Sequence, residues 1–147
     1  MKYTYSYPRP AVTIDIMVFH RTTKQWEILL IERLNEPFKG MWALPGGFIE
    51  MEETLHQSAI RELREETGIA LQQLQQFRTY GNPGRDPRGR TISVVYYAII
   101  ADATKKQVKA GDDAHLAQWS SIEDLPALAF DHATIMQEAM QHLPFLL

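Results

Sequence analysis

The residues best suited to chemistry are three closely spaced glutamates, Glu62, Glu65 and Glu66. On a helix, which turns by about 100° per residue, their side chains fall within about 100° of one another. Apolar residues lie in or beside the same sector, namely Leu55, Ala59 and Leu63. The three carboxylates therefore share a side with the apolar stripe, and we expect them to point toward the body of the protein.

Carboxylates placed this close repel one another, and partial burial increases the free-energy cost of keeping them ionised. A raised pKa or a bound cation can offset it. Hard divalent cations such as Mg²⁺ and Mn²⁺ prefer several carboxylate oxygens over nitrogen or sulfur ligands. The alternative is a solvated charged helix in which Arg61 and Glu65 form an ion pair one turn apart.

The glutamates belong to a longer pattern of fixed residues, which favours the metal site over the solvated helix. The pattern reads Gly47, five residues, Glu53, seven residues, Arg61-Glu62-Leu63, one residue, Glu65-Glu66, one residue, and Gly68-Ile69. It resembles the Nudix box at every fixed position. The resemblance implies a Nudix-type α/β/α sandwich around a mixed β-sheet, in which the box forms a loop–helix–loop catalytic motif. It also implies a metal-dependent hydrolase that cleaves the diphosphate of a nucleoside diphosphate linked to another group.

The same resemblance implies a metal site built by the box. Glu62, Glu65 and Glu66 resemble the metal-binding glutamates of the family, and Gly46 would add a backbone carbonyl. The implied cofactor is Mg²⁺, with Mn²⁺ as a substitute.

Two further catalytic roles follow from the resemblance. Arg61 resembles the arginine that pairs with the earlier glutamate, here Glu53, and holds the helix against its loop. Water attacks phosphorus in this reaction, and a carboxylate must take its proton. We favour Glu65 as this base, although the base varies across the family. Asp112 and Asp113 are alternatives, but two aspartates in a polar loop are also typical of a plain turn.

Stretches outside the box resemble a narrower group, the bacterial ADP-ribose pyrophosphatase-like Nudix proteins. They are residues 7–13, 37–48, 84–90 and 129–132. This resemblance implies hydrolysis of ADP-ribose to AMP and ribose 5-phosphate. One alternative is a nucleoside triphosphate pyrophosphohydrolase that removes damaged nucleotides. Another is a ligand-sensing Nudix domain of a transcriptional regulator. Such regulators carry a C-terminal winged-helix domain, for which we expect no room in this chain, and a sensor has no need of an intact box.

An arginine-rich loop is a candidate for binding the substrate. Arg85, Arg88 and Arg90 place three guanidinium groups in one stretch that glycine and proline stiffen. A guanidinium group can donate two parallel hydrogen bonds to phosphate oxygens, so the cluster suits a terminal phosphate or a diphosphate. The alternative is a solvated surface loop. Arg33, after the second predicted strand, would reach the diphosphate or pair with a neighbouring glutamate.

Composition limits the organisation, partners and location of the protein. The chain has 147 residues, a net charge of -3 and no cysteine, so we expect one domain over residues 1–147 without disulfides. The negative charge gives no reason to expect a long nucleic acid as partner. No apolar run approaches the roughly 20 residues of a membrane helix, and the N-terminus lacks the apolar core of a signal peptide. We therefore expect a cytoplasmic protein that binds a small nucleotide derivative, and the subgroup allows a homodimer.

Periodicity and turn signals predict the elements that must position these residues. Thr54 and Gln57 form a capping box and Gly68 is a typical stop, so a helix is predicted between them. A strand with one buried face is predicted at 12–19, its hairpin partner at 26–31, and further strands at 77–80, 91–100 and 116–119. Pro45-Gly46-Gly47 predicts a turn after a short apolar stretch.

The two ends of the chain carry weaker signals. Asp131 is predicted to cap a last helix that Pro144 prevents from continuing, and His132 is expected to belong to the start of this helix without binding a ligand. Three tyrosines at strand spacing, Tyr3, Tyr5 and Tyr7, suit edge-strand packing or a dimer contact better than base stacking.

Overall fold

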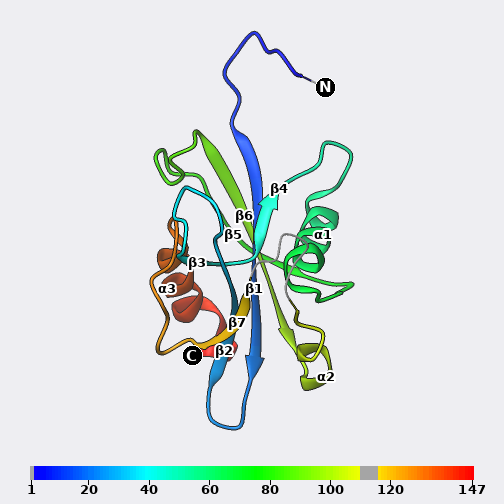
Figure 1. Ribbon diagram of the computed structural model, residues 1–147, viewed down its shortest axis with the longest axis vertical. Coiled ribbons are helices and arrows are strands. Elements are labelled where there is room, and N and C mark those ends of the chain that lie inside the picture. The colour runs from blue at the N-terminus through cyan, green and yellow to red at the C-terminus, as the bar shows by residue number, and fades with distance from the viewer. Residues whose placement is uncertain (1, 110–115) are drawn as a thin grey trace.

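Seven strands form one mixed sheet in the part of the chain that the computed structural model describes, residues 2–109 and 116–147 (Figure 1). The strands are β1 (Ala11–Arg21), β2 (Trp26–Glu32), β3 (Trp42–Ala43), β4 (Gly46–Phe48), β5 (Gln75–Tyr80), β6 (Thr91–Ile100) and β7 (Ala117–Ser121). The main path runs β3-β2-β1-β6-β5, with β4 paired to β1 and β7 paired to β2. β1 and β6 are parallel, and the other paired strands are antiparallel.

Helices cover both faces of this sheet, which confirms the predicted sandwich. The helices are α1 (Leu55–Thr67), α2 (Asp102–Lys105), α3 (His132–His142) and the short 3₁₀ helix η1 (Pro144–Leu146). In Figure 1, α1 and α3 lie on opposite sides of the central strands β1 and β6. None of the helices in the described ranges has the length and hydropathy to span a bilayer.

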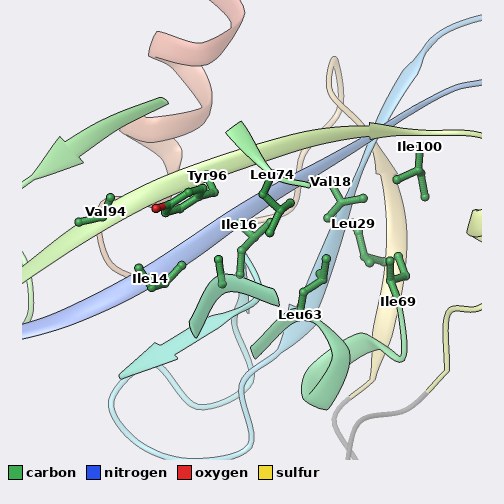
Figure 2. Close-up of a cluster of buried hydrophobic side chains, with 11 residues drawn as sticks. Ile14, Ile16, Val18, Leu29, Leu63, Ile69, Leu74, Val94, Tyr96 and Ile100 are labelled. Carbon is green, nitrogen blue, oxygen red and sulfur yellow. The ribbon is translucent and has the colours of Figure 1, made fainter. Parts of the chain in front are cut away.

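The core between α1 and the sheet depends on alternate residues of β1. Ile14, Ile16 and Val18 are fully buried and belong to the same apolar cluster as Leu63 of α1 and Ile69 just after it (Figure 2). Apolar residues at every second position share one face of a strand, so this strand matches the apolar stripe of an amphipathic helix. The packing therefore fixes which side of α1, and hence which carboxylates, faces the sheet.

The opposite face of β1 is buried as well, which differs from the prediction of one buried face. Met17 and Phe19 pack in a second cluster with Ile135 and Met136 of α3. Because α3 covers this face, residues that periodicity assigned to the less buried side also enter a core. Burial on both faces is what a central strand of a sandwich requires.

The α1 boundaries agree with the predicted capping box and stop. Thr54 Oγ1 accepts from the amide of Gln57 at 3.1 Å, and the Gln57 side chain accepts from the amide of Thr54 at 2.9 Å. Gly68 ends the helix at φ 82°, a left-handed conformation that glycine adopts without strain. The two caps therefore define the helix that carries the glutamates.

Three segments differ from their prediction. Gly46–Phe48 forms a strand rather than only a turn, because it pairs antiparallel with residues 13–15 of β1. Asp131 directly precedes α3, but its carboxylate binds a distant arginine instead of capping the helix. The tyrosines at the N-terminus belong to no strand within residues 2–10. Tyr3 and Tyr5 stack with ring centroids 6.4 Å apart.

Candidate functional site

A cavity of about 210 Å³ opens where β1 and β4 meet the loop at residues 81–90 and the start of α3. Its lining includes five of the predicted site residues, namely Arg33, Gly46, Glu66, Arg85 and Arg88. Outside the lining lie Glu53, Arg61, Glu62, Glu65 and Arg90. The cavity thus joins one carboxylate of α1 to several guanidinium groups.

The glycines of β4 bring its backbone against the carboxylates of α1. The amide of Gly46 donates to Oε1 of Glu66 at 3.1 Å. A Cβ at Gly47 would lie 2.6 Å from the carboxylate of Glu62, and one at Gly46 would lie 2.0 Å from the carbonyl oxygen of Ile14. Neither position has room for a side chain, so glycine permits the close approach of strand and helix.

Arg61 is the hub of a hydrogen-bond network on α1. Its Nε donates to both oxygens of Glu53 at 2.9 and 3.0 Å, so the pair implied by the Nudix resemblance is present. Its Nη1 donates to Glu62 at 2.8 Å and to Glu65 at 3.2 Å. Its Nη2 donates to the carbonyl of Phe48 at 3.2 Å. One guanidinium therefore ties the loop before α1, two glutamates of α1 and the end of β4 together.

Burial makes it unfavourable to ionise two glutamates of α1, Glu62 and Glu66. Burial is the largest cause that raises the pKa of Glu66 to about 9; the amide of Gly46 opposes this rise, and the neighbouring carboxylates of Glu62 and Asp15 add to it. Burial likewise raises the pKa of Glu62, against the opposing effect of Arg61. Two carboxylates are thus held where ionisation is unfavourable unless a positive charge comes close.

The donor set fits a hard divalent cation, because such an ion offsets both the burial and the repulsion of these carboxylates. Across residues 2–109 and 116–147, no three Asp, Glu or His side chains stand close enough together to hold an ion without moving. All three carboxylates already have partners: Glu62 and the half-exposed Glu65 both accept from Nη1 of Arg61, and Glu66 accepts from the amide of Gly46. A three-glutamate site requires these carboxylates to turn away from their present partners.

The arginines of the 81–90 loop do not form the free cluster that their spacing predicted. Arg85 is buried and donates two hydrogen bonds to Asp131, at 2.9 and 2.7 Å. Arg88 is half exposed and donates to Asp86 at 3.1 and 2.8 Å. Arg90 donates to the carbonyl of Gly81 and lies outside the cavity lining. Arg88 is therefore the member of this loop that presents an accessible guanidinium to the cavity.

Arg33 and Arg88 meet around the aromatic rim of the cavity. Arg33 donates to the carbonyl of Pro37 at 2.7 Å instead of pairing with a neighbouring glutamate. Its guanidinium carbon lies 4.8 Å from the ring centre of Phe130, and that of Arg88 lies 5.4 Å from the same ring and 5.1 Å from Phe48. Burial and the charge of Arg88 lower the pKa of Arg33. Arg88 is paired with Asp86, but both guanidinium groups line the cavity and can donate to an anionic ligand there.

Asp15, in the middle of β1, is a cavity residue that the sequence prediction missed. It is buried and accepts a hydrogen bond from the hydroxyl of Ser93. Although burial opposes its charge, His132, Ser93 and Arg85 together hold the pKa of Asp15 below its usual value. A carboxylate inside the alternating apolar pattern of a central strand was a signal that could have identified it.

His132 also lines the cavity, although it was predicted to bind nothing. It is the first residue of α3, as predicted, and its Nδ1 accepts from the amide of Leu44 at 3.0 Å. No local pattern reveals this contact, because 88 residues separate the partners. The two candidate bases Asp112 and Asp113 lie outside the described residues.

Comparison with known proteins decides the family. The family model for the NUDIX domain matches residues 9–143, which is nearly the whole chain. The chain belongs to the Nudix hydrolase family. An ADP-ribose pyrophosphatase of Methanocaldococcus jannaschii is 44% identical over 135 residues, which cover 92% of this chain and 76% of that protein.

Another relative of this Nudix hydrolase is a transcriptional repressor. The ADPR-responsive transcriptional repressor NtrR of Acinetobacter baylyi is 39% identical over 142 residues. These residues are 93% of this chain but 56% of the repressor, so the chain spans little more than half of that relative. The NUDIX domain of Shewanella oneidensis NrtR, in a cocrystal structure with ADP ribose, superposes with a TM-score of 0.85 at 31% identity. That match covers 94% of this chain and 91% of the domain.

Proposed function

We propose that this Nudix hydrolase cleaves the diphosphate of ADP-ribose and releases AMP and ribose 5-phosphate. The observation that carries the proposal is the cavity itself, which joins Glu66 and the glycines of β4 to the guanidinium groups of Arg33 and Arg88. A diphosphate needs positive charge on its oxygens and a metal site beside it. The 44% sequence identity with an ADP-ribose pyrophosphatase supports the choice of substrate.

The metal would be held by Glu62, Glu65 and Glu66, with the carbonyl of Gly46 as a further ligand. Mg²⁺ is the proposed ion, and Mn²⁺ would substitute for it. When bound, such an ion neutralises charge on the phosphate oxygens and lowers the pKa of a water molecule. The raised pKa values of Glu62 and Glu66 support this assignment, because both carboxylates lack sufficient positive charge around them.

The other roles belong to side chains that position or activate the reactants. Glu65 is the proposed base, because its carboxylate is accessible and held by one guanidinium N–H at 3.2 Å, so that it can turn toward the substrate. Arg61 and Glu53 are positioning residues that fix α1 against its preceding loop. Asp112 and Asp113 remain alternative bases.

Arg33 and Arg88 are the proposed diphosphate ligands. Arg85 would act mainly by holding the loop to Asp131, because its side chain is 4% exposed and donates two N–H groups to that carboxylate, whereas Arg88, which is paired with Asp86, is 42% exposed. The position of Arg90, bonded to Gly81 and outside the cavity, gives it no part in this proposal.

Ligand sensing is the second candidate function, and the similarity to an ADPR-responsive repressor favours it. The two candidates share the ligand and differ in whether the ligand is cleaved. The complete box of this chain, from Gly47 to Ile69, supports cleavage, because binding alone requires neither Arg61 nor all three glutamates.

A substrate panel tests the proposal. ADP-ribose, other nucleoside diphosphate sugars and nucleoside triphosphates are incubated with the protein and Mg²⁺, and inorganic phosphate is measured after coupling to a phosphatase for the sugars and to an inorganic pyrophosphatase for the triphosphates. The proposal predicts the highest kcat/KM for ADP-ribose. A higher kcat/KM for a triphosphate would favour the nucleotide-pool alternative, and binding without turnover of any compound would favour sensing.

A further inference from the structure

Two phenylalanines with an unusual backbone conformation meet beside the cavity. Phe38, in the loop between β2 and β3, has a φ of 63°, and Phe130, just before α3, has a φ of 54°. Among residues 2–109 and 116–147, they are the two residues other than glycine with a positive φ. Bulky residues rarely adopt this left-handed conformation, and it persists only where surrounding contacts stabilise it. The contacts of the two rings therefore indicate what the strained backbone maintains.

The two rings contact each other and adjoin a guanidinium group. Their centroids lie 4.8 Å apart at an interplanar angle of 61°, which is an edge-to-face pair. The guanidinium carbon of Arg33 lies 4.8 Å from the ring centre of Phe130, within the range of a cation–π contact. Phe130 lines the cavity, whereas Phe38 does not. Phe38 thus supports a ring of the cavity wall from outside the lining.

The position of Arg33 depends on the loop that carries Phe38. Its Nε donates to the carbonyl of Pro37, next to Phe38, at 2.7 Å, and its Nη2 lies 3.5 Å from another carbonyl oxygen of the same loop. In the part of the chain that the structure describes, Arg33 donates to no carboxylate. Arg88 differs, because Asp86 accepts two hydrogen bonds from its side chain at 3.1 and 2.8 Å. A change in the loop should therefore move Arg33 and leave Arg88 anchored.

We propose that Phe38 is a positioning residue, which holds the guanidinium group of Arg33 in the cavity by supporting the ring of Phe130. This inference rests on the proposed function, in which Arg33 binds the diphosphate.

The place that Arg33 occupies is unfavourable for an arginine without such support. Arg33 and Arg88 lie against the same ring, at 4.8 and 5.4 Å from its centre. Burial and the charge of Arg88 lower the pKa of Arg33, so a free side chain would gain by turning into water. The aromatic pair and the loop carbonyl instead keep the guanidinium group in place before a ligand arrives. Such preorganisation favours binding, because the ligand need not order the side chain.

Variants of Phe38 separate positioning from a general structural role. Phe38→Asn removes the ring but keeps a residue that tolerates a left-handed φ, and Phe38→Gly removes the ring and leaves no backbone strain. Phe38→Tyr keeps the ring. Phe145→Asn is the matched control, because Phe145 is also half-buried and forms an edge-to-face pair, with Phe19 at 5.3 Å, but lies outside the cavity lining. Melting temperatures show whether each variant is folded.

The test measures kcat and KM for ADP-ribose with Mg²⁺, and the Kd for ADP-ribose by calorimetry without metal. Phe38→Asn and Phe38→Gly should raise KM and Kd by about three- to tenfold, on the scale of one lost aromatic pair. They should change kcat by less than about twofold, as expected for lost substrate binding. Phe38→Tyr and Phe145→Asn should keep KM and Kd within about twofold of the wild type.

A double-mutant cycle tests whether Phe38 acts through Arg33. Arg33→Met keeps the aliphatic stem but removes the guanidinium group. In this background Phe38→Asn should change KM and Kd by less than about twofold, because the group that it positions is gone. An undiminished effect in this background would overturn the inference, since Phe38 would then act without Arg33.

Unchanged KM and Kd in Phe38→Asn and Phe38→Gly would also overturn the inference, as would a fall in kcat with KM unchanged. Loss of folding in both variants would overturn it too, because the fold itself would then require the ring. The outcome for the proposed function is separate. Weaker binding of ADP-ribose by these variants, in a protein that does not cleave it, would refute hydrolysis but support the positioning role. Cleavage with equal KM in all variants would refute the positioning role alone.

Discussion

Glu66 should destabilise the metal-free protein at neutral pH, and Glu66→Gln should remove that cost. Burial raises the pKa of Glu66 from 4.5 to about 9, so between these values the folded state keeps a proton that the unfolded state releases. Stability from this group is therefore complete below pH 4.5 and falls as the pH rises toward 9. At about 1.4 kcal/mol per pH unit, the loss of folding free energy between pH 4.5 and pH 7 is about 3.5 kcal/mol.

Thermal unfolding in a chelator, across pH 4.5 to 8, measures this effect. Glutamine keeps an oxygen to accept from the amide of Gly46 but has no charge. At pH 7 the variant should melt roughly 5–10 °C above the wild type, and the two should converge near pH 4.5. Mg²⁺ should stabilise the wild type far more than the variant. Glu52→Gln, at an exposed position before the helix, is the matched control.

Parallel melting curves for the wild type and Glu66→Gln at every pH would refute the reasoning, since the carboxylate would then be solvated in the folded state. A variant that melts lower at pH 7 would also refute it, because the charge would then stabilise the fold.

Three further predictions concern the metal, the loop and the core. At pH 7.5, Mg²⁺ binding should release about one proton, because Glu66 must ionise to bind the ion. The heat of Mg²⁺ binding, measured by calorimetry, should therefore differ between two buffers of different ionisation enthalpy. Equal heats of binding in the two buffers would contradict this. Arg88→Ala should raise KM for ADP-ribose about tenfold, because it removes a guanidinium–phosphate contact, whereas Arg90→Ala should leave KM unchanged. Steady-state kinetics in which the two variants change KM equally would contradict the assignment. Leu63→Ala should reduce the free energy of unfolding by about 2–5 kcal/mol in urea titrations, and a loss below about 1 kcal/mol would contradict the packing of α1.

The helix that carries the glutamates could be predicted from the sequence to within a residue. Its signals are local: the capping box lies within four residues, from Thr54 to Gln57, and Gly68 must adopt a left-handed conformation where the helix ends. The central strand was predictable for the same reason, because alternation along one segment sets its faces. Its second buried face depends on α3, which lies more than 100 residues further along the chain.

The partners of the arginines could not be predicted, because they depend on contacts between distant segments. Arg85, Arg88 and Arg90 look equivalent in the sequence. Arg85 donates to the carboxylate of Asp131, 46 residues away, and Arg90 donates to the carbonyl of Gly81. Spacing indicates which side chains are near one another along the chain but not which of them are already paired in the fold.

The carboxylate lining of the site was predictable only in part. Glu62, Glu65 and Glu66 share one side of α1, but of these three only Glu66 lines the cavity, where it accepts from the amide of Gly46, whereas the carboxylate of Glu62 packs against Gly47. Glu65 points instead to Arg61. Helical spacing predicts which side of the helix the glutamates share. The distance of each carboxylate from the cavity depends on the strand that packs against the helix.

The most direct test of the central claim is product analysis with ADP-ribose. The wild type and Glu66→Gln are each incubated with the compound in Mg²⁺ or in excess chelator, and the products are separated by ion-exchange chromatography. The wild type in Mg²⁺ should yield AMP and ribose 5-phosphate in equal amounts. Chelator should stop the reaction, and Glu66→Gln should slow it by about a hundredfold or more, as expected for loss of a charge-stabilising group. Intact ADP-ribose after incubation of the folded wild type with Mg²⁺ would contradict the account, as would undiminished turnover by Glu66→Gln.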